Sequence, residues 1–146
     1  MPKAPPDNRR DPPWDWNRSI IISIKPKWAE AILDGSKRYE YRKGAPRRTE
    51  TPFEMEIYAT APVKKIVGVA GIDEIYSGTV DEIIDKTLRF VPHTEKEVRE
   101  YFDGSKKAHA FSIAYYRKFD EPKELDGKAP RNFRYLKDKS EVSRVE

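Results

Sequence analysis

Short segments in which apolar and polar residues alternate make up most of the body of this chain. Residues 20–24 form an apolar run dominated by isoleucine, which predicts a buried first strand. Alternation predicts further strands over 37–43, 54–58, 65–72 and 108–116, and a short last strand over 133–136. Glycines within 65–72 indicate that this strand is strongly curved or closely approached by another backbone.

Three helices are predicted between these strands. The first begins at Pro26, which suits a first helical turn, and ends at Asp34 and Gly35, because glycine accepts the left-handed backbone at a helix end. Two more helical segments follow near 79–88 and 94–102, and the second opens with a capping box of Thr94 and Glu97. Five or six strands with an early helix and a helical insertion predict an α+β fold, a small and partly open β-barrel.

The two ends of the chain differ in composition from its body. Residues 1–18 hold five prolines among charged and polar residues, which indicates an N-terminal arm. Its Trp14 and Trp16 either dock on the body, which is the preferred interpretation, or stack on a ligand. Residues 137–146 are charged and nearly free of large apolar side chains, which is typical of a tail that frays. A single domain is therefore expected over 19–136.

Composition narrows the chemistry of the chain. Cysteine is absent, which excludes disulfides and thiolate chemistry, and with only two histidines neither a metal site nor a cofactor is expected. No apolar run approaches the roughly 20 residues that cross a bilayer, and no signal peptide is apparent, which predicts a cytoplasmic protein without membrane contact. The formal charge is +4, and the stretch from Ser19 to Glu50 alone, with eight basic and four acidic residues, carries the same charge. This clustering suits a polyanion-binding surface as well as an ordinary solvated face.

One motif runs from the stop of the first helix into the second strand: Gly35-Ser-Lys37-Arg-Tyr-Glu40-Tyr-Arg42. Further matches follow the same order along the chain: Ser23-Ile-Lys-Pro26, Tyr58-Ala-Thr-Ala-Pro62, Ile66-Val-Gly68 and Phe133-Arg-Tyr-Leu136. Together these motifs resemble the ASCH domain of the PUA-like superfamily, over about residues 19–136. The resemblance implies a PUA-like β-barrel with a cleft beside its flanking helices, and the motif residues at the mouth of that cleft.

The motif residues also suggest their own chemistry. Arg42 can bind a phosphate or a base edge through two parallel hydrogen bonds, and Lys37 supplies a charge, or a base if burial lowers its pKa. Glu40 can orient the guanidinium or accept a hydrogen bond from a base, although Glu40 and Arg42 also suit an ordinary strand salt bridge, worth at most about 1 kcal/mol if exposed. Neighbouring aromatic rings offer stacking surfaces, and their alternative role is in the core. The candidate nucleic-acid-binding residues are Gly35, Lys37, Arg38, Tyr39, Glu40, Arg42, Lys43, Arg47, Arg48 and Trp28, with Lys37 and Glu40 catalytic if the protein is an enzyme.

We expect the protein to be a module that binds RNA or single-stranded nucleic acid in a basic cleft. The cleft could also recognise a modified base or a free nucleoside. The family resemblance implies two enzymatic alternatives, a ribonuclease and an acetylcytidine amidohydrolase. Efficient deacetylation is not expected for two reasons. The deacetylating members carry a threonine in place of Glu40, and they use a glutamate in the helical insertion whose counterpart cannot be identified in this sequence. His93 and His109 are interpreted as ordinary surface or structural histidines. A protein-interaction adaptor that uses Trp14 and Trp16 is the third possibility, and the oligomeric state is not indicated.

Overall fold

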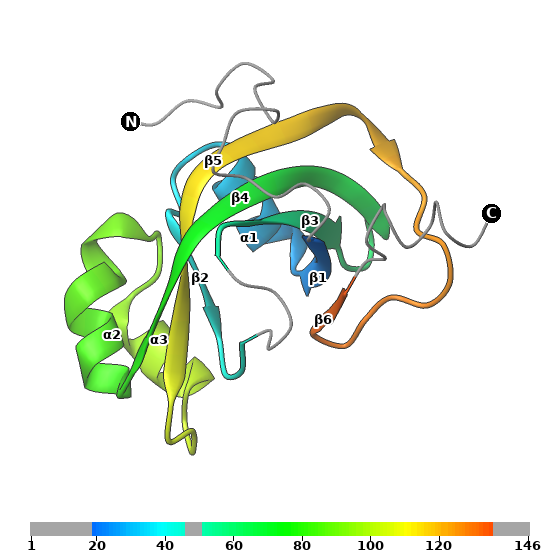
Figure 1. Cartoon of the computed structure of the whole chain (residues 1–146). Coiled ribbons are helices and arrows are strands. Elements are labelled where there is room, and N and C mark those ends of the chain that lie inside the picture. Colours follow the sequence, from blue (N-terminus) through cyan, green and yellow to red (C-terminus); the bar gives the residue numbers. More distant parts are fainter. Residues whose placement is uncertain (1–18, 46–50, 136–146) are drawn as a thin grey trace.

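A computed structural model describes residues 19–45 and 51–135, which form one curled six-stranded sheet with three α-helices and a short 3-10 helix (Figure 1). The strands are β1 (Ser19–Ile24), β2 (Tyr39–Arg42), β3 (Phe53–Ala59), β4 (Lys65–Gly78), β5 (Ala108–Lys123) and β6 (Phe133–Tyr135). The helices are α1 (Pro26–Leu33), α2 (Val80–Thr87), η1 (Leu88–Phe90) and α3 (Glu95–Tyr101). The predicted α+β architecture, with an early helix and a helical insertion, is confirmed.

Parts of the predicted organisation lie outside the described residues. These are the arm over 1–18 with its two tryptophans, the tail over 137–146, and the candidate binding residues Arg47 and Arg48. In the part of the chain that the structure describes, no helix combines the length and the apolarity needed to cross a membrane.

The strand order is β2-β5-β4-β3-β1-β6, with β1 parallel to β3 and antiparallel to β6. The apolar run predicted as a buried strand is indeed buried, because Ile20 and Ile22 are both 0% exposed. They share a core cluster with Phe53 and Phe111, whose rings meet edge to face at 6.3 Å between centroids, and with residues of α1. Helix α1 therefore packs on the sheet, and its start is fixed beside the end of β1.

Strands β4 and β5 are longer than the alternation predicted, since they continue to Gly78 and Lys123. They pair with each other along most of their length, and this backbone pairing carries both strands past the segments that alternate. The register shifts near Gly71, where an added Cβ would lie 2.0 Å from the Tyr115 ring. Glycine is required there by the close approach of that ring, in line with the predicted curvature.

The helical insertion, formed by α2, η1 and α3, connects β4 to β5 (Figure 1). Helix α3 begins with the predicted capping box, in which Thr94 and Glu97 each accept a hydrogen bond from the backbone N–H of the other. The insertion has its own apolar cluster, in which Val98 and Phe102 pack with Tyr41 of β2. This packing brings the insertion against the strand that carries the ASCH-like motif.

Candidate functional site

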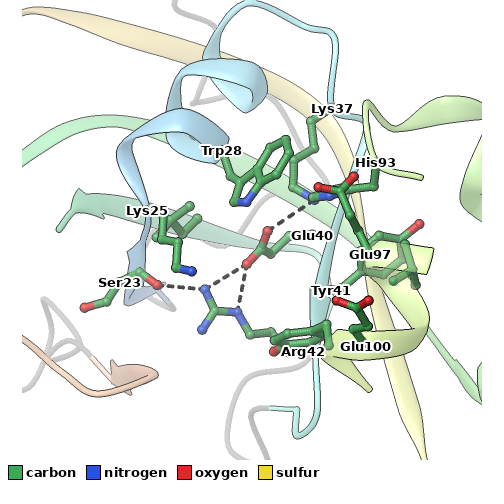
Figure 2. A pocket seen from close by; sticks show the side chains of 13 residues that line it. Ser23, Lys25, Trp28, Lys37, Glu40, Tyr41, Arg42, His93, Glu97 and Glu100 are labelled. Atoms are coloured by element: carbon green, nitrogen blue, oxygen red, sulfur yellow. Dashed lines mark hydrogen bonds and ion pairs between the residues drawn. The ribbon is translucent and has the colours of Figure 1, made fainter. Parts of the chain in front are cut away.

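A pocket of about 520 Å³ lies where the end of β1, the start of α1, strand β2 and the helical insertion meet (Figure 2). Four predicted binding residues line it: Trp28, Lys37, Glu40 and Arg42. Glu40 lies between the Lys37 amine and the Arg42 guanidinium, so these three side chains form one charged cluster (Figure 2). The exposed fractions of the Lys37, Glu40 and Arg42 side chains are 2%, 7% and 11%. The strand salt bridge of the alternative interpretation is present between Glu40 and Arg42, but it is largely buried and includes Lys37.

The turn after α1 brings Lys37 into this pocket. Gly35 ends the helix in the left-handed region, with a φ of 88°, which explains a glycine at this place. The backbone N–H of Lys37 then donates to the carbonyl of Ala31 over 3.0 Å, so the chain folds back against the helix before β2 begins. Gly35 itself is buried and does not line the pocket.

Glu40 holds the charged cluster together. Its Oε2 accepts a hydrogen bond from Nε of Arg42 over 2.8 Å and forms an ion pair with Nη2 at 2.7 Å, and its Oε1 lies 3.6 Å from Nζ of Lys37. The guanidinium also donates to the carbonyl of Ser23 over 2.7 Å and to Oδ1 of Asn132. Four of the five N–H groups of Arg42 are therefore engaged, and a two-pronged contact with a phosphate would require this network to open.

His93 also lines the pocket, although the sequence led us to expect an ordinary surface or structural histidine. Its Nε2 lies 2.7 Å from Nζ of Lys37. The histidine ring packs 4.0 Å from the Trp28 ring and 5.7 Å from the Tyr41 ring, measured between centroids. No local pattern indicated the contact, because 56 residues separate Lys37 from His93.

The surroundings shift the pKa of both partners in this contact. Burial lowers the pKa of Lys37 from 10.5 to about 8; the Glu40 carboxylate opposes this effect and the Arg42 charge adds to it. Burial, followed by the charge of Lys37, lowers the pKa of His93 from 6.5 to about 4. At neutral pH the histidine is uncharged and the lysine is mostly protonated, so Nε2 of His93 accepts a hydrogen bond from the ammonium.

Helix α3 adds two carboxylates, Glu97 and Glu100, to the lining of the pocket. With Lys25 and the charged cluster, the lining holds three basic and three acidic side chains, so the predicted basic cleft is charge-balanced. The capping box indicated the helix, but no sequence signal placed it against β2. Within residues 19–45 and 51–135, no three His, Asp or Glu side chains are grouped to hold a metal ion.

Besides Gly35, three predicted binding residues of the described chain lie outside the pocket lining: Arg38, Tyr39 and Lys43. The Tyr39 ring lies 6.3 Å from the Phe90 ring, and the Arg38 guanidinium lies 5.6 Å from the same ring. Lys43 is exposed, with its amine 5.3 Å from the centre of the Tyr101 ring. The motif thus divides between the pocket and its surroundings.

Comparisons with known proteins relate this chain to other proteins, although no family model matches it. An ASCH domain-containing ribonuclease of Zymomonas mobilis is 34% identical over 96 residues, which is 66% of this chain and 64% of that protein. A large ribosomal subunit protein uL22 of Ureaplasma parvum is 31% identical over 124 residues, 82% of this chain and 39% of that protein. The chain thus spans less than two thirds of these curated relatives.

A crystal structure of ASCH from Zymomonas mobilis has the same fold, with a TM-score of 0.77 and 28% identity. The match covers 88% of this chain and 94% of that one. A mutant of the same protein, with a phenylalanine in place of a tyrosine, also has a TM-score of 0.77 and is 27% identical to this chain. Together with the ordered motifs, the identity and the shared fold show that this chain belongs to the ASCH domain family.

Proposed function

We propose that this chain binds RNA at the pocket of the charged cluster and cleaves it as a ribonuclease. The observation that carries the proposal is Lys37, whose amine is buried in the pocket, contacts His93 at 2.7 Å and has a pKa lowered to about 8. A group with a pKa near the working pH is suited to proton transfer. The Zymomonas mobilis relative named as a ribonuclease supports RNA as the substrate.

The proposed reaction uses the 2′-hydroxyl of RNA as the nucleophile. The unprotonated amine of Lys37 takes the proton of this hydroxyl, the 2′-oxygen bonds to the adjacent phosphorus, and the bond from phosphorus to the 5′-oxygen breaks. The ammonium then returns the proton to the 5′-oxygen, which leaves a 2′,3′-cyclic phosphate and a 5′-hydroxyl end. His93 acts as a positioning residue, because its Nε2 holds the lysine amine in place.

The walls of the pocket suit an unpaired base. Trp28, Tyr41 and Tyr101 line it, and aromatic rings are the usual partners of bases that leave a strand. A charge-balanced lining fits an uncharged base better than it fits a phosphate, so the sugar-phosphate backbone would cross the mouth of the pocket. As the sequence predicts a cytoplasmic protein, we propose a cytoplasmic RNA as the substrate.

Cleavage of a labelled single-stranded RNA by the purified chain tests this function. The wild type should produce cyclic phosphate ends, should leave DNA of the same sequence intact, and should accelerate as the pH rises towards about 8. Lys37→Met, which keeps the volume of the buried side chain, should lose at least about 100-fold in rate. The exposed Lys118 of β5 lies outside the pocket lining, so Lys118→Met is the matched control.

Two results would overturn the proposal. One is RNA cleavage that continues unchanged in a folded Lys37→Met variant, because the activity would then come from another site or from a contaminant. The other is complete loss of activity in a metal chelator, since proton transfer by Lys37 needs no metal ion. Circular dichroism of each variant separates loss of chemistry from loss of folding.

A further inference from the structure

We propose that the pocket selects guanine, and that Glu97 and Glu100 of α3 determine this choice. The inference rests on the proposed function, because it names the base that the RNA-binding pocket takes. It follows from a count of the hydrogen-bonding groups that remain for a ligand. The donors on one side of the pocket are largely engaged, whereas the acceptors on α3 are largely available.

The charged cluster offers few donors to a ligand. The amine of Lys37 lies 2.7 Å from Nε2 of His93 and forms an ion pair with the Glu40 carboxylate at 3.6 Å, so these two groups hold it in place. Arg42 retains one N–H group beyond its bonds to Glu40, Ser23 and Asn132. The donors that remain on this side of the pocket are the last N–H group of Arg42 and the exposed amine of Lys25, which also lines the pocket.

Helix α3 offers acceptors. Glu97 accepts the backbone N–H of Thr94 with Oε1 over 2.8 Å, and among the described residues its Oε2 has no hydrogen-bond partner. Within the described part of the chain, the Glu100 carboxylate forms only a long ion pair of 3.8 Å with Lys96, and both side chains of that pair are mostly exposed. Residues three apart in a helix lie on the same face, so the two carboxylates act on the same side of the pocket.

Guanine matches this distribution best. Its N1–H and N2 amino group point in parallel and fit the two oxygens of one carboxylate, while its O6 can accept the remaining N–H group of Arg42. Adenine and cytosine present an amino group without the neighbouring N–H. Uracil presents one N–H between two carbonyl oxygens, which the carboxylates of α3 repel. The expected order of preference is therefore guanine, then adenine and cytosine, then uracil.

Short oligouridines that carry one central guanine, adenine, cytosine or no substitution test the inference. All sugars are 2′-O-methylated, which blocks the proposed reaction, and binding is measured by fluorescence anisotropy. The wild type should bind the guanine oligonucleotide about tenfold more tightly than pure oligouridine. Glu97→Gln or Glu100→Gln, according to which carboxylate takes the base edge, should reduce this preference to about twofold or less, because an amide offers one acceptor oxygen where a carboxylate offers two.

The variants are chosen to keep the helix intact. Glutamine can replace Glu97 in the capping box, so Glu97→Gln leaves the start of α3 supported. Glu95 lies on the same helix but outside the pocket lining, and Glu95→Gln should leave the preference unchanged. Equal binding of the four oligonucleotides, or a guanine preference that survives both pocket variants, would overturn the inference while leaving RNA binding in place. Absence of binding to all four, with no cleavage of unmodified RNA, would instead overturn the proposed function.

Discussion

The burial of Lys37 predicts that this protein becomes more stable as the pH rises above neutrality. The side chain is 2% exposed, and burial lowers its pKa from 10.5 to about 8 against the opposing effect of Glu40. The unfolded chain exposes an ordinary lysine, so the unfolded state binds this proton more tightly than the folded state does. The loss of stability that comes from burying the protonated amine is complete below pH 8 and disappears as the pH approaches 10.5. One pKa unit corresponds to about 1.4 kcal/mol. The free energy of unfolding should therefore gain about 3 kcal/mol from this residue over that interval.

Urea unfolding of the wild type and of Lys37→Met across this pH interval measures the effect. Tyrosines and other lysines titrate in both proteins, so the difference between their unfolding free energies isolates Lys37. That difference should change by about 3 kcal/mol between pH 8 and 10.5, in favour of the wild type at the higher pH. Lys118→Met, at an exposed position, should show no such change relative to the wild type. If the unfolding free energies of wild type and Lys37→Met change with pH by the same amount, Lys37 keeps an ordinary pKa, and its proposed role in proton transfer loses its basis.

Two further predictions concern the sheet and the pocket. Gly71→Ala places a Cβ 2.0 Å from the Tyr115 ring and should lower the free energy of unfolding, measured in urea, by about 1 to 3 kcal/mol. Gly44→Ala, where an added Cβ has no atom within 4 Å, should change it little. Equal unfolding free energies of the two variants would contradict the close approach of β4 and β5. Efficient deacetylation of acetylcytidine is not expected, because Glu40 stands where the family resemblance implies a threonine and is already ion-paired. Cytidine release, followed by chromatography and lost in Lys37→Met, would contradict that expectation.

The features that the sequence predicted well depend on neighbours in the chain. An apolar run located the first strand and alternation the other five, the glycine after α1 marked the end of that helix, and the Thr94 and Glu97 pair marked the start of α3. Each of these signals lies within a few residues, where steric and hydrogen-bonding preferences act directly. The ends of β4 and β5 were missed, since cross-strand pairing between distant segments extends them.

The same distinction separates the two parts of the pocket. The motif on β2 supplied the charged cluster, whose members are close in sequence and were predicted together. His93, Glu97 and Glu100 were missed as pocket residues, because their position depends on how the insertion packs against the strand. The insertion is held there by the packing of Val98 and Phe102 on Tyr41. This packing depends on the shapes of side chains that are distant in sequence, so the pattern of apolar and polar residues does not predict it.

This division has a chemical consequence for the site. The motif alone would place a lysine beside a carboxylate and a guanidinium at the surface, where water would leave its pKa close to the ordinary value. The insertion changes that outcome, because it brings His93 against the amine and helps to enclose it. Burial is the largest cause of the lowered pKa of Lys37, so the apolar packing of α3 on β2 contributes to tuning the group that we propose as the base. In this chain the motif provides the charges, and the insertion provides the environment that makes one of them reactive.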